Sequence, residues 1–111
     1  MPELPEVETS RRGIEPYLLN RKIKNITIRQ HKLRWPIPEN LAELATGKVI
    51  RAVSRGAKYL YLVLDNDTII IHFGMSGSLR ICTDKIPAEK HDHIDIQVSS
   101  NKILRLRDPR K

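Results

Sequence analysis

The first apolar positions of the chain recur at helical spacing. Val7, Ile14 and Leu18 lie seven and four residues apart, which places their side chains on one face of a helix. Pro5 suits the first turn of a helix, because the N–H that proline lacks would have no partner there. The pattern therefore predicts a helix over residues 5–19.

A second, shorter helix is predicted between Pro38 and Gly47. Proline is tolerated at the start of a helix and glycine is common just past its end, so these two residues mark its limits. The side chains expected to face inward are those of Leu41, Leu44 and Ala45.

Most of the remaining chain has the pattern of β-strands, with alternating apolar and polar positions or short apolar runs. The predicted strands are residues 26–28, 49–55, 59–64, 68–73, 79–83, 93–98 and 102–106. Residues 65–67 and 99–101 are polar, and each segment is expected to join its neighbouring strands in a hairpin. The runs 59–64 and 68–73 are almost continuously apolar, which predicts burial of both faces. Together these elements predict an α+β fold, mostly β: a two-layer β-sandwich of about seven to eight strands with an amino-terminal helix and one further short helix.

Composition is typical of a folded domain and excludes several classes of protein. The 111 residues are 40% hydrophobic, which is too apolar for a disordered basic tail, and the length predicts one domain. The only cysteine, Cys82, excludes a disulfide within the chain and a zinc site built from several of its thiolates. The longest apolar run is far too short to cross a bilayer, and the first residues lack the basic start of a signal peptide. We therefore expect a soluble, cytoplasmic protein without a membrane anchor.

Positive charge dominates the chain and is concentrated in two segments. Lys and Arg number 20 and Asp and Glu number 13, so the formal net charge is +7. Residues 21–34 hold six basic residues and no acid, and residues 102–111 hold five basic residues and one acid. The start of the chain is acidic by contrast, with Glu3, Glu6, Glu8 and Glu15. This pattern favours a polyanion-binding surface beside a local acidic site, although an ordinary solvated surface would give the same counts.

The amino terminus could supply a nucleophile. If Met1 is removed, Pro2 has a free secondary amine, and an α-amino group with a pKa of about 7.7–8.0 is partly neutral at cellular pH. Such an amine can attack the anomeric carbon of a sugar and form a Schiff base. Glu3 would then be an adjacent acid or base, and Glu6 could hold or deprotonate the amine. The alternative is a proline that merely begins the chain, and if Met1 is retained the Pro2 nitrogen is an amide that cannot attack.

Two further residues lie where a predicted strand meets a glycine-containing turn. Lys58 follows Gly56 at the start of a strand, where it could contact a phosphate or donate a proton. The alternative for Lys58 is a charge that protects a sheet edge. Met75 lies between Gly74 and Gly77, where it could be a wedge between bases or a core methionine in a turn.

Two basic motifs occur later in the chain. Lys90 and His91 could contact phosphates, whereas the two histidines around Asp92 make only a weak metal-binding pattern. Pro109 restrains the chain just before Arg110, which would direct the guanidinium toward a groove or a phosphate.

Together these segments resemble the formamidopyrimidine-DNA glycosylase family, bacterial base-excision enzymes that act on oxidised purines. The resemblance runs the length of the chain in the family's order and covers residues 2–9, 34–36, 57–60, 72–79, 89–93 and 108–110. Each segment is short, but their joint occurrence in this order is specific.

The resemblance implies a bifunctional DNA glycosylase and abasic-site lyase that flips an oxidised purine, such as 8-oxoguanine or a formamidopyrimidine, out of duplex DNA. Pro2 is similar to the family's nucleophile, which forms a Schiff base at C1′. Glu3 is similar to the acid that assists opening of the deoxyribose ring, and Glu6 to the carboxylate that supports the amine and the lesion. Lys58 resembles the lysine at the scissile phosphate.

The resemblance also implies contacts with damaged double-stranded DNA. Met75 and Arg110 are similar to residues that fill the gap left by the flipped base, with Arg110 facing the orphan cytosine. His91 and Arg110 resemble contacts with the DNA backbone, and Lys90 is expected to join them.

Members of this family continue beyond the equivalent of Lys111, with a helix-two-turns-helix domain and a zinc finger. We therefore expect residues 1–111 to be the amino-terminal catalytic domain of a longer, monomeric bacterial protein that associates with the nucleoid. No cofactor is expected in this chain, and one structural zinc is expected in the carboxy-terminal part. The domain alone is expected to have little or no activity.

Two other hypotheses stay open from the sequence. The first is a non-catalytic nucleic-acid-binding β-domain that uses the basic segments only. The second is an unrelated small basic β-domain, for instance of ribosome or chaperone type, which would require the ordered motif matches to be accidental.

Overall fold

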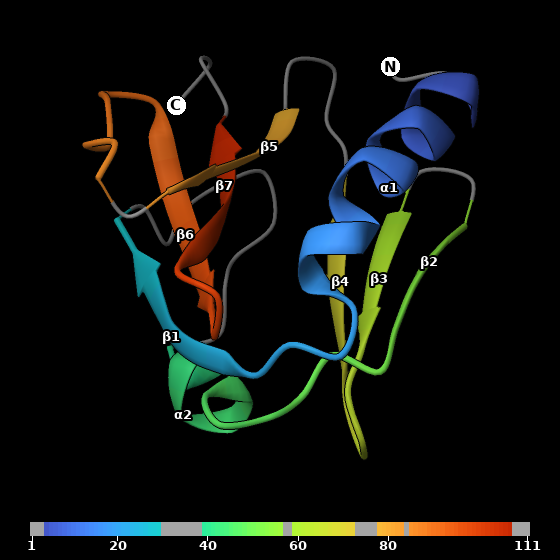
Figure 1. The fold of residues 1–111 in the computed structure, drawn as a ribbon, viewed down its shortest axis with the longest axis horizontal. Helices are drawn as coiled ribbons and strands as arrows, with labels where there is room; N and C mark the ends of the chain where they lie inside the picture. Colours follow the sequence, from blue (N-terminus) through green and yellow to red (C-terminus); the bar gives the residue numbers. More distant parts are fainter. Residues whose placement is uncertain (1–3, 30–38, 57–58, 73–77, 84, 108–111) are drawn as a thin grey trace.

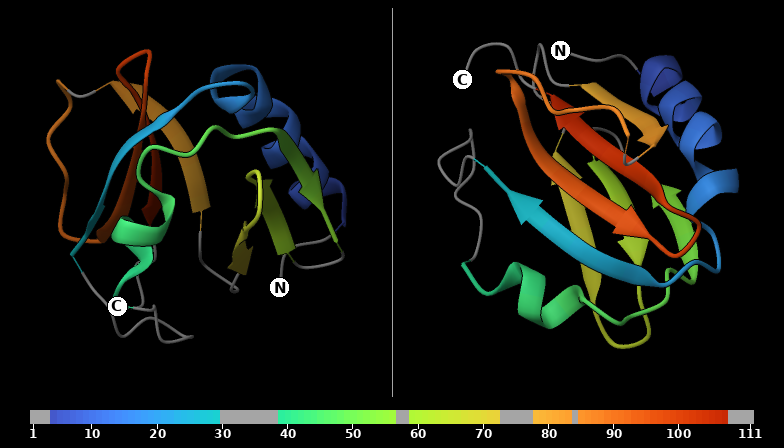
Figure 2. Two further views of the ribbon diagram at one scale, coloured as in Figure 1. Left: turned by 90° about the horizontal axis from the view of Figure 1, so that it is seen from below. Right: turned by 60° about the vertical axis from the view of Figure 1, so that its left-hand side comes forward.

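The chain folds into two antiparallel β-sheets. The computed structural model describes residues 4–29, 39–56, 59–72, 78–83 and 85–107. Its strands are β1 (Ile23–Ile28), β2 (Ala52–Arg55), β3 (Tyr59–Val63), β4 (Thr68–His72), β5 (Ser78–Thr83), β6 (Asp92–Val98) and β7 (Lys102–Arg107). The first sheet has the order β1-β6-β7-β5, and the second has the order β2-β3-β4. Figures 1 and 2 show the sheets as two layers, which confirms the predicted β-sandwich.

The helix α1 (Leu4–Leu18) closes one edge of the sandwich, because it packs against β2 and β3 of one sheet and against β5 of the other. Ile14 and Leu18 are buried, as their spacing predicts, and the side chain of Val7 lies outside the described part. Neither α1 nor any other helix of the described residues is long and apolar enough to span a membrane.

The helix α2 (Leu41–Ala45) is a single short turn that packs against β1. Ala45 is buried, but Leu44 is 54% exposed. The inward orientation predicted for Leu44 is therefore wrong. A helix of five residues presents only one narrow face to its neighbour, and Leu44 projects beside that face.

The second sheet buries only one of its faces. On β3, Leu60 and Leu62 are fully buried, whereas Tyr59 is 38% exposed. On β4, Ile70 pairs with Tyr61 and is 60% exposed. Side chains alternate between the faces of a strand, and here only the inner face meets the core. The prediction that these apolar runs are buried on both faces is therefore wrong.

Neighbouring isoleucines on β4 should respond differently to the same substitution. We expect Ile70→Thr to change the free energy of unfolding by less than about 0.5 kcal/mol, because its side chain is exposed. Ile69 packs against the core, so Ile69→Thr should cost about 1–3 kcal/mol by burying a hydroxyl. Both changes keep a β-branched residue, and urea denaturation measures the difference. Equal losses in the free energy of unfolding of the two variants would show that the outer face of β4 is covered.

The two predicted hairpins are confirmed. β3 and β4 pair as far as Val63 and Thr68, on either side of residues 65–67. β6 and β7 are joined through residues 99–101, where Asn101 has a φ of 61°. Asparagine tolerates this left-handed conformation better than most residues, so the turn suits its sequence.

Candidate nucleic-acid interface

Strand register brings the ends of several elements together. In the second sheet, Tyr59 at the start of β3 pairs with His72 at the end of β4. In the first sheet, Arg107 at the end of β7 pairs with Ser78 at the start of β5 and with Asp92 at the start of β6. Figure 1 shows these strand ends and the start of α1 at one end of the sandwich, at the top of the picture. We call this end of the sandwich the common end.

The segments that carry the predicted site residues all adjoin the common end in the sequence. Lys58 directly precedes β3, and Met75 lies between β4 and β5. Lys90 and His91 directly precede β6, and Arg110 follows the last residue of β7 by three positions. The candidates that lie outside the described residues are Pro2, Glu3, Lys58, Met75 and Arg110, and Glu6 is described only as part of the backbone of α1.

Lys90 and His91 occupy the two central positions of a four-residue turn. The N–H of Asp92 donates to the carbonyl of Glu89 (3.1 Å), and the N–H of Glu89 donates to Oδ2 of Asp92 (2.8 Å). An aspartate that accepts a nearby backbone N–H in this way stabilises a turn. Lys90 is exposed, and the half-buried ring of His91 meets the ring of His93 edge to face at 6.3 Å. The two predicted phosphate contacts therefore lie on a hydrogen-bonded turn at the common end.

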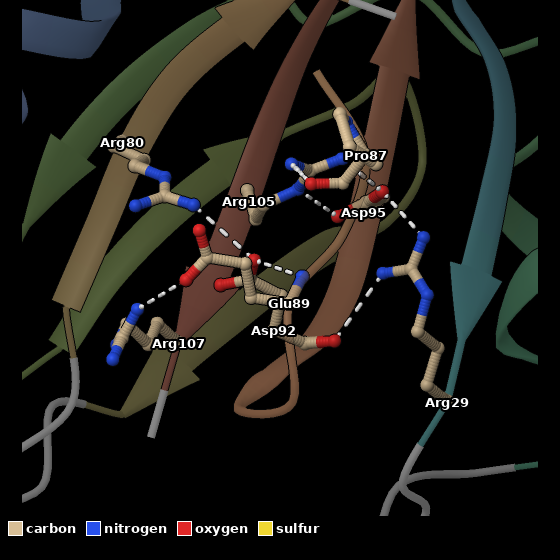
Figure 3. A network of polar contacts seen from close by, with 8 residues as sticks. All are labelled: Arg29, Arg80, Pro87, Glu89, Asp92, Asp95, Arg105 and Arg107. Atoms are coloured by element: carbon tan, nitrogen blue, oxygen red, sulfur yellow. Dashed lines mark hydrogen bonds and ion pairs between the residues drawn. The ribbon is translucent and has the colours of Figure 1, made fainter. Parts of the chain in front are cut away.

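Asp92 acts as a buried acceptor. Its side chain has no exposed surface, and its Oδ2 also accepts a hydrogen bond from Nη2 of Arg80 at 3.2 Å (Figure 3). Nη1 of Arg29 donates to the main-chain carbonyl of Asp92 at 3.3 Å. Among the described residues, no group of three or more His, Cys, Asp or Glu side chains could hold a metal ion. The weak metal-binding pattern around Asp92 thus gains no support.

A buried ion-pair network that the sequence analysis missed lies beside this turn. Asp95 and Arg105 pair across β6 and β7, and Nε and Nη2 of Arg105 donate to the two carboxylate oxygens at 2.9 and 3.0 Å. Nη2 of Arg29 also donates to Oδ2 of Asp95, at 2.8 Å. The side chain of Arg105 is only 2% exposed, and its Nη1 donates to the carbonyl of Pro87 (Figure 3). Arg105 belongs to the basic segment 102–111, from which a polyanion-binding surface was expected. Its buried side chain instead stabilises the sheet and does not add to such a surface.

Asp95 makes the stability of the fold sensitive to acid. Burial alone would raise the pKa of Asp95, but the hydrogen bonds from Arg105 and Arg29 outweigh burial and hold the pKa below its ordinary value. The folded state then binds this proton more weakly than the unfolded state, so the stabilisation is present above the unfolded pKa of about 3.9 and is lost as the pH falls through the folded pKa.

We expect urea denaturation over a pH series to show this loss in the unaltered chain. The Asp95→Asn variant has no carboxylate to protonate at this position, so its stability should fall less steeply with acid over the same range. An equally steep fall in the variant would assign the acid sensitivity to other carboxylates.

Comparison with known proteins gives one consistent family. The sequence matches the family described as formamidopyrimidine-DNA glycosylase N-terminal domain over residues 1–111. It is 53% identical to the formamidopyrimidine-DNA glycosylase of Shewanella woodyi and 55% identical to that of Escherichia coli, in each case over 111 residues. These alignments cover 100% of this chain and 41% of each relative, so the chain spans less than half of the length of these relatives.

Solved structures agree with the sequence comparison. A structure of MutM in complex with carbocyclic 8-oxo-G-containing DNA has a TM-score of 0.88 at 38% identity, over 99% of this chain and 42% of that chain. The Lactococcus lactis Fpg (MutM) in complex with FAPY-dG-containing DNA has a TM-score of 0.87 at 36% identity, over 97% of this chain and 41% of that chain. With a match over all of its residues and the same fold, this chain belongs to the formamidopyrimidine-DNA glycosylase family.

Proposed function

We propose that this chain is the nucleophile-bearing, amino-terminal part of a bifunctional DNA glycosylase and abasic-site lyase. The full-length protein removes oxidised purines, 8-oxoguanine and formamidopyrimidines, from double-stranded DNA in base-excision repair in the bacterial cytoplasm. The observation that carries the proposal is the common end of the sandwich in a chain of this family. Strand pairing within each sheet brings together there the strand ends that lie next to the candidate segments in the sequence.

Pro2 supplies the nucleophile once Met1 has been removed. Its secondary amine attacks C1′ of the damaged nucleotide, and the bond from C1′ to the base breaks with its electron pair leaving on the base. The proton that the amine loses on forming the new bond neutralises the departing base. Glu3 protonates the ring oxygen as the deoxyribose opens, which leaves an iminium, a Schiff base between Pro2 and the sugar. Glu6, on α1, supports the amine and the bound lesion.

The lyase step breaks the DNA strand by elimination. A proton leaves C2′, its electron pair forms a double bond next to the iminium, and the 3′ phosphate departs. Lys58 precedes the first residue of β3, so it is attached to a rigid strand. Its role is to contact the scissile phosphate and to donate a proton in the elimination.

The remaining candidates hold the DNA. Lys90 and His91 contact backbone phosphates from the turn before β6, and Arg110 contacts the backbone and faces the orphan cytosine. Met75 fills the space that the flipped base leaves. The exposure of Lys90 and the hydrogen bonds that close its turn support this assignment.

The steps above use an amine, carboxylates and a lysine of this chain and require no cofactor from it. The proposal places one structural zinc in the carboxy-terminal part of a monomeric full-length protein. The 111-residue chain alone should have little or no activity, because the binding cleft needs that second part.

Borohydride trapping tests the proposal. A chimera in which residues 1–111 replace the matching part of the Escherichia coli relative is mixed with a duplex that contains 8-oxoguanine, and borohydride reduces any Schiff base. We expect a covalent protein–DNA adduct that peptide mass spectrometry locates at Pro2, and none with an undamaged duplex. DNA binding without an adduct would contradict the catalytic assignment and favour a non-catalytic binding domain.

A further inference from the structure

We propose that Asp92 is a positioning residue, whose buried carboxylate shapes the Glu89–Asp92 turn so that Lys90 and His91 can contact DNA phosphates. This inference rests on the proposed function, because it concerns residues assigned there to the DNA backbone. Asp92 itself does not touch DNA in this arrangement, since its side chain has no exposed surface.

Three polar groups of Asp92 fasten the turn to the sandwich. Oδ2 accepts the N–H of Glu89 at 2.8 Å, and the N–H of Asp92 donates to the carbonyl of Glu89 at 3.1 Å. The carbonyl of Asp92 accepts from Arg29 at 3.3 Å. Since Asp92 is the first residue of β6 and pairs with Arg107, its own backbone is fixed by the sheet. The strand therefore fixes Asp92, and Asp92 holds the turn through its carboxylate and its N–H.

The negative charge of Asp92 has a specific use at this position. A buried carboxylate is costly unless it is paired, and Nη2 of Arg80 supplies the pairing charge at 3.2 Å. Arg80 is 44% exposed, so it keeps much of its contact with water. An amide in place of the carboxylate would lose the charge of this ion pair, and its one oxygen would accept from Glu89 and Arg80 more weakly than the charged Oδ2 does. Its NH2 group would take the place of Oδ1, which is buried without a hydrogen-bond partner among the described residues. The turn would then be held less firmly.

The decisive measurement is the sign of the change in DNA affinity. Asp92→Asn removes one negative charge, which in general strengthens the binding of a polyanion. Loss of a correctly placed phosphate contact should instead weaken binding about tenfold at low salt. It should also make the slope of log K against log[salt] shallower by about 0.9, the value for one phosphate. Both quantities are measured with the chimera on an 8-oxoguanine duplex at a temperature where all variants are folded.

Asp65→Asn provides the charge-matched control. Asp65 lies in the β3–β4 turn, at the opposite end of β3 from Tyr59, and forms an exposed pair with Arg51 at 2.7 Å. The substitution Asp65→Asn changes the net charge by the same amount, but at a place away from the common end. We therefore expect it to leave DNA binding unchanged or slightly tighter. If both variants behaved alike, the effect would be one of net charge and the inference would be wrong.

A double-mutant cycle separates positioning from a general loss of structure. In a background with Lys90→Ala and His91→Ala, adding Asp92→Asn should weaken binding no further, because its effect passes through those two side chains. An additive loss would overturn the inference. If the unaltered chimera binds no DNA, the proposed function fails and the inference with it; if the chimera binds DNA and Asp92→Asn retains its affinity and salt slope, only the inference fails.

Discussion

Replacement of Arg105 by methionine should lower the free energy of unfolding by about 3–5 kcal/mol, the range for breaking a buried ion pair from one side. The substitution leaves an unbranched, though shorter, apolar side chain, and it removes both hydrogen bonds to Asp95 and the one to the carbonyl of Pro87. Asp95 would stay buried, with Arg29 as its remaining partner. Urea denaturation of the unaltered chain and the variant measures the loss.

A compensating change tests the cause of that loss. In the Arg105→Met variant, the further change Asp95→Leu removes the carboxylate that lacks its partner, and replacement of a whole buried pair by apolar residues is often nearly neutral. We therefore expect the double variant to recover most of the stability. Arg29 is 35% exposed and can turn to solvent when Asp95 is absent. A loss below about 1 kcal/mol in the single variant would place the pair among ordinary surface salt bridges.

This network was within reach of the sequence, although it was missed. Residues 99–101 are predicted as the turn between β6 and β7, and an antiparallel pair about that turn places Asp95 opposite Arg105, as observed. Each residue is a lone charge between apolar neighbours. The burial of the pair could not be predicted, because it depends on the segment that contains Pro87 lying over the outer face of the sheet.

The strands and α1 could be predicted because their apolar periodicity is local information. The extent of burial could not, because it depends on what packs against a face. Ile70 lies between two other isoleucines in the sequence, a pattern that is typical of a buried strand. It is nevertheless exposed, because it lies on the outer face of a three-stranded sheet. The orientation of Leu44 differs from the prediction for a related reason, since a single helical turn packs mainly against β1 and leaves Leu44 exposed.

The residues of the candidate site could be predicted from their chemical types, but not from their spacing along the chain. The motifs identify which side chains have suitable chemistry, but they are separated by up to about a hundred positions in the sequence. Strand register brings together the described strand ends next to several of these motifs, since it pairs Arg107 with both Ser78 and Asp92. The role of Asp92 in closing the turn that carries Lys90 and His91 emerges only from its hydrogen bonds.

Retention of Met1 should abolish covalent trapping at Pro2. With Met1 present, the nitrogen of Pro2 belongs to a tertiary amide, whose lone pair is delocalised into the carbonyl and cannot attack C1′. After removal of Met1, the same nitrogen is a free secondary amine, and an α-amino group with a pKa of about 7.7–8.0 is partly unprotonated at neutral pH. The nucleophile of the proposed mechanism therefore exists in only one of two chains that differ by a single residue.

Two preparations of the chimera, with and without Met1, provide the matched comparison, and intact mass verifies each. Both should bind an 8-oxoguanine duplex, because the contacts from Lys90, His91 and Arg110 do not depend on the terminal nitrogen. Borohydride should trap an adduct with the processed chain only, and the yield should rise with pH as the amine loses its proton. An adduct of equal yield from the Met1-bearing chain would mean that another amine, the α-amino group of Met1 or a lysine side chain, can form the Schiff base in place of Pro2, and peptide mass spectrometry would identify which.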